Sequence, residues 1–329
     1  MRAPLLIVGQ GLAGTVLGHA CERAGIEFEM ADAGHATAAS RVGAGIINPI
    51  TGQRIVKSQG IDALRAPALR MYRELETVLG VSLVRVMRVR RLFRDDGERR
   101  VFAEKAARGE LAPYAKADGG GADAEGFWIE GALRIDTAAL IAAARARWLR
   151  AGILREERVV LAEALAEYET VIACTGADEA GAWGGVRCVR ASGHILRITV
   201  AGLTPDVILN GGHWVLPTEP GEARVGATYV RDGAGDAGEA RAELERSATE
   251  LLGAAVFSVL AQEAGQRVTT ADRQPITGRD PGERRLGIFN GLGSKGTLLA
   301  PWLAEQWVRH LKDGAAFEPS VAVERFKER

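Results

Sequence analysis

Near its start the chain reads Pro4-Leu5-Leu6-Ile7-Val8-Gly9-Gln10-Gly11-Leu12-Ala13-Gly14. The pattern predicts a short buried strand, a tight glycine turn and a helix over residues 15–24. A second apolar run over residues 26–31 predicts another strand, which ends at Asp32. This order of strand, glycine turn, helix, strand and acid is typical of a dinucleotide-binding unit.

Each glycine of the turn has a separate expected role. Gly9 makes the tight turn, Gly11 lets the backbone approach a pyrophosphate, and Gly14 lets the helix pack closely on the strand. The helix N-terminus offers free N–H groups and partial positive charge to phosphates. Asp32 is placed to bind the ribose hydroxyls of an adenosine. The alternative is a glycine-rich turn in an ordinary βαβ unit.

Bulk properties restrict the class of protein. The chain has 329 residues, which suggests two domains, and its 42 basic and 42 acidic residues balance. No overall field therefore attracts nucleic acid or an anionic membrane. Three cysteines without metal-ligand spacing predict no metal site and indicate a reducing compartment, so a cytoplasmic location is expected. The first residues are interpreted as a strand rather than a targeting segment, and no apolar stretch is long enough to span a bilayer.

The remaining chain alternates between helical and strand-like patterns. Helices are expected at residues 61–79, 138–150, 238–252 and 297–311. Strands are expected at residues 81–94, 127–129, 159–161, 170–177, 193–200, 214–216, 223–229 and 286–290. Residues 118–126 are expected to form an exposed loop.

The nucleotide-type units are split along the chain. They lie at residues 1–58, 134–185 and 262–329, and strand-rich segments at residues 59–133 and 186–261 interrupt them. We therefore expect an α/β fold, α+β overall, with a doubly wound Rossmann-like domain. Interleaved with it is a mainly antiparallel sheet domain that would cover the reactive end of the cofactor.

Three further segments favour FAD over NAD. Residues 171–176 predict a buried strand that meets a glycine turn, although an ordinary strand end would look the same. Residues 291–296, Gly-Leu-Gly-Ser-Lys-Gly, open a helix whose N–H groups could face an electron-rich flavin ring. Residues 40–45 form a small, flexible segment after the ribose acid, which suits a pyrophosphate and flavin but also a surface loop.

In this order the motifs resemble those of the D-amino-acid-oxidase-like FAD-dependent oxidoreductases. That family includes glycine oxidase, sarcosine oxidase and the oxidase half of a bifunctional tRNA-modifying enzyme. Residues 267–278 resemble the family's Arg-x-x-Thr-x-Asp-x-x-Pro-x-x-Gly run, and residues 291–296 with Ala300-Pro301 resemble its last flavin motif. The run from Gly291 to Glu305 looks closest to the tRNA-enzyme branch.

The resemblance implies FAD as the cofactor, bound noncovalently because no cysteine lies near the last glycine motif. The implied FAD-binding positions are Gly9, Gly11, Leu12, Ala13, Gly14, Asp32, Ala33, Ser40, Arg41, Gly45, Thr175, Gly176, Gly291, Gly293, Ser294, Lys295, Gly296 and Thr297.

The resemblance also implies an activity: oxidation of an amine or amino acid that bears a carboxylate, by hydride transfer to the flavin. Arg267 matches the family's carboxylate-binding arginine, and an ion pair with Asp272 is the alternative. Lys295 is the second candidate cation. Further candidates for the substrate site are Arg54, Tyr229 and His194. Arg54 and Lys57 form either a basic pair at the site or a solvated edge. His194 could equally be an ordinary strand histidine.

Other functions stay open at this point. Leu292 stands where many oxidases have histidine, which leaves the substrate and the use of oxygen open. The alternatives are a tRNA-modifying flavoenzyme, a 2-hydroxy-acid dehydrogenase and a flavin-binding protein without turnover. Nucleic acid is disfavoured as a partner by the balanced charge and by the lack of an attached methyltransferase domain, and the oligomeric state is open. A basic cluster is either an RNA footprint or a charged sheet face beside Asp95 and Asp96: Arg85, Arg88, Arg90, Arg91 and Arg94.

Overall fold

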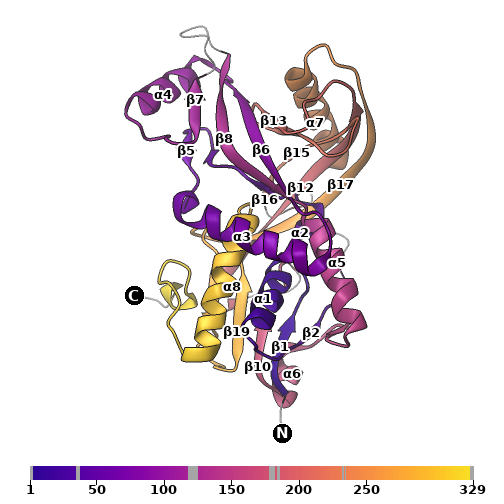
Figure 1. Cartoon of the computed structure of the whole chain (residues 1–329), viewed down its shortest axis with the longest axis vertical. Coiled ribbons are helices and arrows are strands. Elements are labelled where there is room, and N and C mark those ends of the chain that lie inside the picture. Colours follow the sequence, from indigo (N-terminus) through magenta and orange to yellow (C-terminus); the bar gives the residue numbers. More distant parts are fainter. Residues whose placement is uncertain are drawn as a thin grey trace.

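The computed structural model describes residues 3–34, 38–117, 125–177, 182–183, 186–231, 233 and 235–326. The molecule is elongated, with a helix-rich part around the N-terminal strand and a second part formed mainly by long strands (Figure 1). The described strands form a six-stranded sheet, an eleven-stranded sheet and a small hairpin. The fold is mixed α/β, as the sequence predicts.

The six-stranded sheet has the order β18-β19-β10-β1-β2-β9. Its strands are β1 (Ala3–Val8), β2 (Glu29–Ala31), β9 (Leu154–Arg155), β10 (Tyr168–Ala173), β18 (Ile276–Arg279) and β19 (Leu286–Asn290). All neighbours pair in parallel except β18, which runs antiparallel to β19. Val8 lies in register with both Ala31 and Ala173, so the carboxyl ends of β1, β2 and β10 meet at one edge of the sheet.

Helices cover this sheet because its central strand is apolar on both faces. Leu5 and Ile7 of β1 pack in the main core, whereas Leu6 and Val8 pack in a separate cluster with α6 (Leu161–Glu167). The main core is completed by α1 (Leu12–Arg23), α3 (Ile61–Leu79), α5 (Thr137–Arg150) and α8 (Gly296–Asp313). Helices α1 and α8 lie side by side, although they come from opposite ends of the sequence (Figure 1).

The eleven-stranded sheet is dominated by two long antiparallel strands, β12 (Val186–Val200) and β17 (Phe257–Thr270). Its path is β11-β12-β15-β14-β13-β6-β8-β3, with β16 and β17 paired to β12 and β7 paired to β8. Pairing is antiparallel except between β13 and β6. The other strands are β3 (Ile46–Ile47), β6 (Val84–Leu92), β7 (Ala115–Ala117), β8 (Gly126–Ile135), β11 (Ala182–Trp183), β13 (Val207–Asn210), β14 (Trp214–Pro217), β15 (Glu222–Gly226) and β16 (Val230–Arg231).

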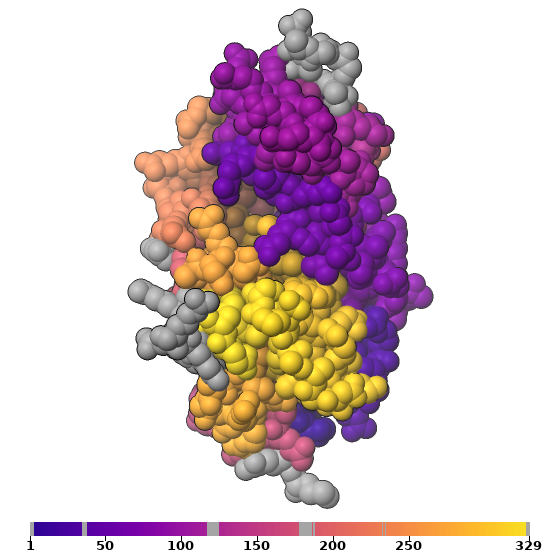
Figure 2. Space-filling view, turned by 90° about the vertical axis from the view of Figure 1, so that its left-hand side faces the viewer, coloured from indigo at the N-terminus to yellow at the C-terminus, as the bar shows by residue number. Residues whose placement is uncertain are grey.

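Smaller elements complete the fold. Helices α4 (Asp96–Ala107) and α7 (Ala237–Leu252) lie beside the large sheet, far from the N-terminus (Figure 1). The remaining elements are α2 (Ala39–Val42), the hairpin of β4 (Ile50–Thr51) and β5 (Val56–Lys57), and a 3₁₀ helix (Val323–Phe326). In the space-filling view, C-terminal residues lie in the middle of the molecule, beside segments from its first third (Figure 2).

Most expected elements are found, and their ends follow local capping chemistry. Helix α3 ends at Gly80, which adopts φ 68°, and α5 begins after Asp136, whose Oδ1 accepts a hydrogen bond from the Ala139 N–H at 3.0 Å. The strand expected at residues 159–161 is wrong, because Val160 is the N-cap of α6. The sequence Leu-Ala-Glu-Ala-Leu-Ala-Glu that follows is rich in strong helix formers.

Two further outcomes concern residues between these elements. Helix α4 was not expected, and residues 118–124 of the expected loop lie outside the described residues. The division into two domains stays a prediction. Its expected boundary at residue 262 falls inside the continuous strand β17.

Candidate active site

One cavity of about 560 Å³ brings together segments from the whole length of the chain. Its wall includes the β1–α1 turn, α2 and the residues after it, the carboxyl end of β10, part of β17, and the turn before α8. These segments lie at the carboxyl edge of the parallel sheet and under the large sheet. A ligand site is expected at such an edge in doubly wound folds.

Steric contacts separate the three glycines of the first turn into two kinds. Gly9 has φ 97°, and a Cβ there would lie 2.6 Å from the carbonyl oxygen of Cys174. A Cβ at Gly14 would lie 1.9 Å from the carbonyl oxygen of Gly9. At Gly11, by contrast, a Cβ would meet only the Ser40 hydroxyl, at 3.1 Å. Gly9 and Gly14 are therefore required by packing, whereas Gly11 keeps open a part of the cavity wall.

The space beside Gly11 has the chemistry that phosphates need. The N-cap of α1 is Gly11, which has no side chain with which to cap this helix end. Leu12 and Ala13 of the first turn line the cavity, and this end of the helix carries partial positive charge. A pyrophosphate fits this place because it would supply the missing acceptors.

Asp32 lies at the end of β2 and is almost fully buried, with 6 % of its surface exposed. Its Oδ2 accepts a hydrogen bond from the Gln10 N–H at 2.7 Å. Its Oδ1 accepts from the Gly34 N–H at 2.8 Å and from Nη1 of Arg145 at 2.8 Å. The carboxylate is thus held in one orientation at the cavity wall, where the sequence predicts ribose binding. Arg145, which sequence reasoning missed, also contacts Glu156 at 2.8 Å.

The turn before α8 and the end of β10 offer further ligand-binding groups. Gly291 and Gly293 adopt φ values of 71° and 56°, and α8 also begins without a side-chain cap. The hydroxyl of Thr175 is buried and has no hydrogen-bond partner among the described residues. Because a buried hydroxyl without a partner is costly, a ligand is the natural source of one. These features fit an FAD molecule lying along the cavity.

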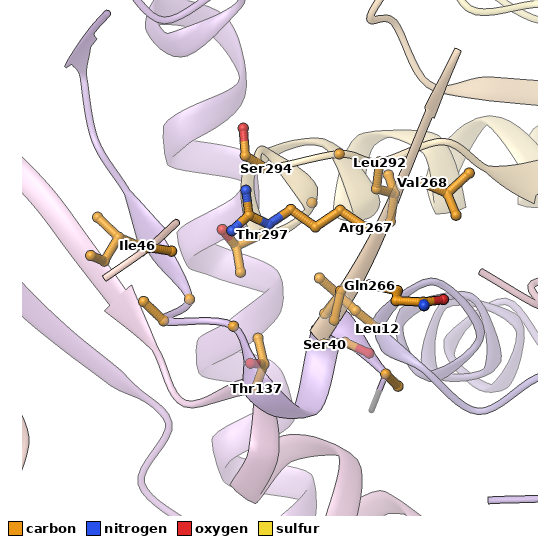
Figure 3. A pocket seen from close by; sticks show the side chains of 18 of the residues that line it. Leu12, Ser40, Ile46, Thr137, Gln266, Arg267, Val268, Leu292, Ser294 and Thr297 are labelled. Atoms are coloured by element: carbon orange, nitrogen blue, oxygen red, sulfur yellow. The ribbon is translucent and has the colours of Figure 1, made fainter. Parts of the chain in front are cut away.

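Arg267 is the cation of this cavity that sequence reasoning singled out. In Figure 3 its side chain extends across the cavity in the direction of Thr297 and Ser294. Its Nη2 is 3.4 Å from the carbonyl oxygen of Thr228, and its guanidinium lies 5.7 Å from the ring centre of Tyr229. Burial lowers the pKa of Arg267, which nevertheless stays charged.

The alternative ion pair between Arg267 and Asp272 is not formed. Asp272 instead pairs with Arg325, at 2.8 Å between Oδ2 and Nε. Among the residues that the structure describes, no carboxylate contacts Arg267. The guanidinium is therefore a half-buried cation that points into the cavity and has no anionic partner within the described part of the chain.

The predicted positions divide into two groups by location. Those in the cavity wall are Gly9, Gly11, Leu12, Ala13, Asp32, Ser40, Gly45, Thr175, Gly176, Arg267, Gly293, Ser294, Gly296 and Thr297. Those outside it are Gly14, Ala33, Arg41, Arg54, Tyr229, Gly291 and Lys295. Ala33, Arg41, Arg54 and Tyr229 are exposed, and Lys295 is half-buried with its pKa lowered by burial. The role of each residue stays a prediction.

Several residues of the wall were not anticipated as site residues. They are Ile46, Arg91, Arg94, Thr137, Asn210, Trp214 and Gln266. Most of them belong to the large sheet or to the segments beside it, and they carry no local motif. The sequence pattern presents Arg91 and Arg94 only as members of the basic cluster.

The basic cluster does not form one patch. Arg88 pairs with Glu130 at 3.0 Å and lies over the ring of Trp128 at 4.3 Å. Arg91 and Arg94 both form ion pairs with Glu98.

His194, a further candidate for the substrate site, is buried, and its Nδ1 contacts Nε2 of Gln262 at 3.0 Å. It does not line the cavity.

Comparisons with known proteins agree with this architecture. The chain is 31% identical over 323 residues to the tRNA 5-methylaminomethyl-2-thiouridine biosynthesis bifunctional protein MnmC of Maricaulis maris, covering 94% of the chain and 52% of that relative. The protein of the same name from a Caulobacter species is 29% identical over 329 residues, covering 92% of the chain and 53% of the relative. The chain spans about half the length of these curated relatives.

Solved structures share the fold at lower identity. The crystal structure of glycine oxidase from Geobacillus kaustophilus has a TM-score of 0.79 at 19% identity and covers 97% of this chain and 98% of that one. Iminodiacetate oxidase from a Chelativorans species has a TM-score of 0.75 at 21% identity, with 98% of each chain covered. A family model described as DAO, FAD dependent oxidoreductase, matches residues 5–309. The chain therefore belongs to this family of FAD-dependent oxidoreductases, and its cofactor is FAD.

Proposed function

We propose that this protein oxidises an amine or amino acid that bears a carboxylate, by hydride transfer from the carbon next to the nitrogen. The observation that carries this proposal is Arg267, a half-buried cation that extends into the cavity and has no carboxylate partner among the described residues. When bound, FAD supplies the hydride acceptor. The residues of this chain supply binding, orientation and the electrostatic environment.

Arg267 would bind the carboxylate of the substrate. A planar guanidinium donates two parallel hydrogen bonds to a carboxylate, which fixes both position and orientation. The interaction is strengthened because the side chain is half-buried. A bound carboxylate would also supply the counterion that the described residues do not give Arg267.

The described wall of the cavity holds no histidine, and its single carboxylate is Asp32, which Arg145 and two backbone N–H groups already hold. No side chain there is placed to remove a proton from a bound ammonium group. The amine would therefore bind in its neutral form. Activity should then rise with pH as more of the free amine loses its proton.

The N-terminus of α8 and Lys295 would favour negative charge near the turn that precedes the helix. Burial lowers the pKa of Lys295, and an anion at this end of the helix would raise it again. These groups are proposed to stabilise the negative charge that would develop on the hydride acceptor when the substrate is oxidised.

The curated relatives favour a second candidate function. Both are named as tRNA-biosynthesis proteins, and they match nearly the whole of this chain. The amine would then be carried on a tRNA nucleotide. Salt-sensitive tRNA binding that is lost when the arginines at positions 85, 88 and 90 are replaced by glutamine would support this candidate.

Three buried cysteines without disulfide partners, Cys21, Cys174 and Cys188, support a cytoplasmic location, which we include in the proposal. Within the part of the chain that the structure describes, no helix has the length and apolarity to cross a membrane. The same part holds no group of residues suited to a metal ion.

The test is anaerobic bleaching of the flavin absorbance in the purified holoprotein. Glycine, N-methylglycine, iminodiacetate and D-amino acids are expected to include a reducing substrate, whereas methylamine and dimethylamine, which lack the carboxylate, should not bleach the flavin. Bleaching by 2-hydroxy acids instead would identify a hydroxy-acid dehydrogenase. Bleaching by none of these compounds, with tRNA carrying the modified nucleotide also inert, would leave a flavin-binding protein without turnover and overturn the proposal.

A further inference from the structure

Two arginines in the cavity wall share one carboxylate. Arg91 is at the end of β6 with 6 % of its surface exposed, and its Nη2 lies 3.1 Å from Oε1 of Glu98, which is 5 % exposed. Arg94 reaches the same Oε1 through Nε at 2.9 Å and Nη2 at 2.5 Å. Both arginines line the cavity. The three side chains therefore carry a net charge of +1.

The charge balance leaves Arg91 under-compensated. Its Nε is buried and has no hydrogen-bond partner among the described residues. Burial lowers the pKa of Arg91. This direction is expected for a desolvated cation whose only carboxylate partner among the described residues, Glu98, is shared with Arg94. A buried donor of this kind costs free energy unless an acceptor arrives from outside the chain.

The neighbouring wall is suited to a polar, anionic group. Asn210 on β13 lies in register with Arg91, and Asn210, Gly212 and Trp214 all line the cavity near it. A Cβ at Gly212 would lie 3.6 Å from Cδ of Arg94, so a side chain there would take up space beside this arginine. An amide, a flat aromatic surface and two guanidinium groups thus face the same cavity.

We propose that Arg91 and Arg94 form a second anion subsite, so that the substrate carries a carboxylate or phosphate in addition to the carboxylate bound by Arg267. This inference rests on the proposed function. Arg267 is on β17, and in the sheet path β12, β15, β14 and β13 lie between that strand and β6. The two subsites therefore come from different strands that line one cavity, and the substrate carries two separate anionic groups.

The subsite is tested by binding alone, without turnover. Saturated α,ω-dicarboxylates of increasing length are titrated into the holoenzyme by calorimetry, beside monocarboxylates of equal length. We expect a diacid of fitting length to bind about tenfold more tightly than its monoacid, the gain from one charged hydrogen-bonded contact. Arg94→Gln should abolish this difference. Arg267→Ala should weaken the binding of both ligands.

Two further variants control for structural effects. Arg88→Gln removes an exposed arginine of the same strand, paired with Glu130, and should keep the preference for diacids. The variant Arg91→Met removes one buried cation and leaves Glu98 paired with Arg94, so no lone charge remains; it should lose the preference while the protein stays folded. Equal binding of diacids and monoacids at every length, or an unchanged preference in both Arg94→Gln and Arg91→Met, would overturn the subsite.

The source of the second anion is distinguished by two more ligands, ω-phosphonocarboxylates and a short 5′-phosphorylated RNA. Competition by the RNA that disappears in Arg94→Gln would assign a nucleotide phosphate; tight binding of the small diacids alone would assign a small molecule. A diacid preference in a protein that oxidises no amine would keep the subsite and reject the proposed function. Oxidation of monocarboxylate amines without a diacid preference would do the reverse.

Discussion

Asp272 and Arg325 form an ion pair, with 2.8 Å between Oδ2 and Nε. A second hydrogen bond joins Oδ1 of Asp272 to the Thr270 hydroxyl. Burial raises the pKa of this carboxyl, but the hydrogen bonds from Arg325 and Thr270, with that from the Gln274 N–H, outweigh burial and hold the pKa low. The acid nearest to Arg267 in the sequence motif is thereby engaged elsewhere. Because Asp272 pairs with Arg325, Arg267 is available to bind the carboxylate of a substrate.

Replacing Arg267 with alanine should therefore impair substrate binding more than folding. We expect FAD to stay bound and KM for a carboxylate-bearing amine to rise about 30-fold, from the loss of roughly 2 kcal/mol of charge pairing in a half-buried site. Steady-state kinetics measure the change. Arg273→Gln, at an exposed neighbouring arginine, is the control and should leave KM unaltered. Unchanged KM in Arg267→Ala would remove this residue from the substrate site.

The two kinds of glycine in the first turn should respond differently to substitution. Gly11→Val should lower FAD retention strongly while the apoprotein stays folded, because the added side chain points at Ser40 and the open cavity. Gly14→Ala should destabilise the apoprotein itself, since its Cβ would meet the Gly9 carbonyl. Flavin content after gel filtration and thermal unfolding of the apoproteins separate the two effects. Equal loss of apoprotein stability in both variants would contradict this assignment.

Arg224 links the large sheet to the segment after α2. Its Nη1 donates to the Gly43 carbonyl at 3.2 Å, its Nη2 donates to the Val42 carbonyl at 2.5 Å, and Nη2 also pairs with Glu263 at 2.7 Å. Arg224→Met should raise the Kd for FAD about tenfold, because the loop that leads to Gly45 loses its fixed position. Fluorescence titration of the apoprotein with FAD gives the value.

The matched control for Arg224 is Arg197→Met, at an exposed arginine of the partner strand that pairs with Glu222. This variant should bind FAD as the unaltered protein does. An equal Kd for all three proteins would show that the hydrogen bonds of Arg224 do not position the cofactor loop.

His19 should make stability depend on pH. It is buried in α1, its Nε2 has no hydrogen-bond partner among the described residues, and its pKa is lowered first by burial and then by Arg23. The unfolded chain takes up a proton near pH 6.5, whereas the folded protein resists protonation at this position until lower pH. The free energy of unfolding should therefore fall as pH drops below 6.5, by up to about 1.4 kcal/mol per pH unit.

Urea titrations at pH 7.0 and 5.5 measure this effect of His19. His19→Gln removes the titrating group, so the variant should lose less stability between the two pH values than the unaltered protein. Glu22, Glu74 and Arg147 also act on His19 and remain in the variant, which isolates the contribution of the imidazole. The same pH dependence in both proteins would show that His19 does not titrate in this range.

Much of the secondary structure could be predicted because its signals are local. The helix end at Gly80 and the cap at Asp136 depend on a few adjacent residues, and the apolar run of β1 decides its own burial. Helix α4 was missed because Asp95-Asp96-Gly97 looks like a turn, although Asp95 in fact caps the helix by accepting from the Glu98 N–H at 2.8 Å. Strand β17 was missed as one long element because polar residues interrupt its pattern.

The sequence by itself determined the glycine turn between β1 and α1. The sterics of Gly9, Gly11 and Gly14 and the uncapped start of α1 arise within a short segment, whose backbone conformation leaves few choices. Only the tertiary structure decided which charges are paired. Arg145 pairs with Asp32, which is 113 residues away in the sequence, and Arg325 pairs with Asp272, which is 53 residues away. Arg91 and Arg94 line the same cavity as Arg267. Such pairings depend on how distant strands and helices pack, and no local pattern of residues records that.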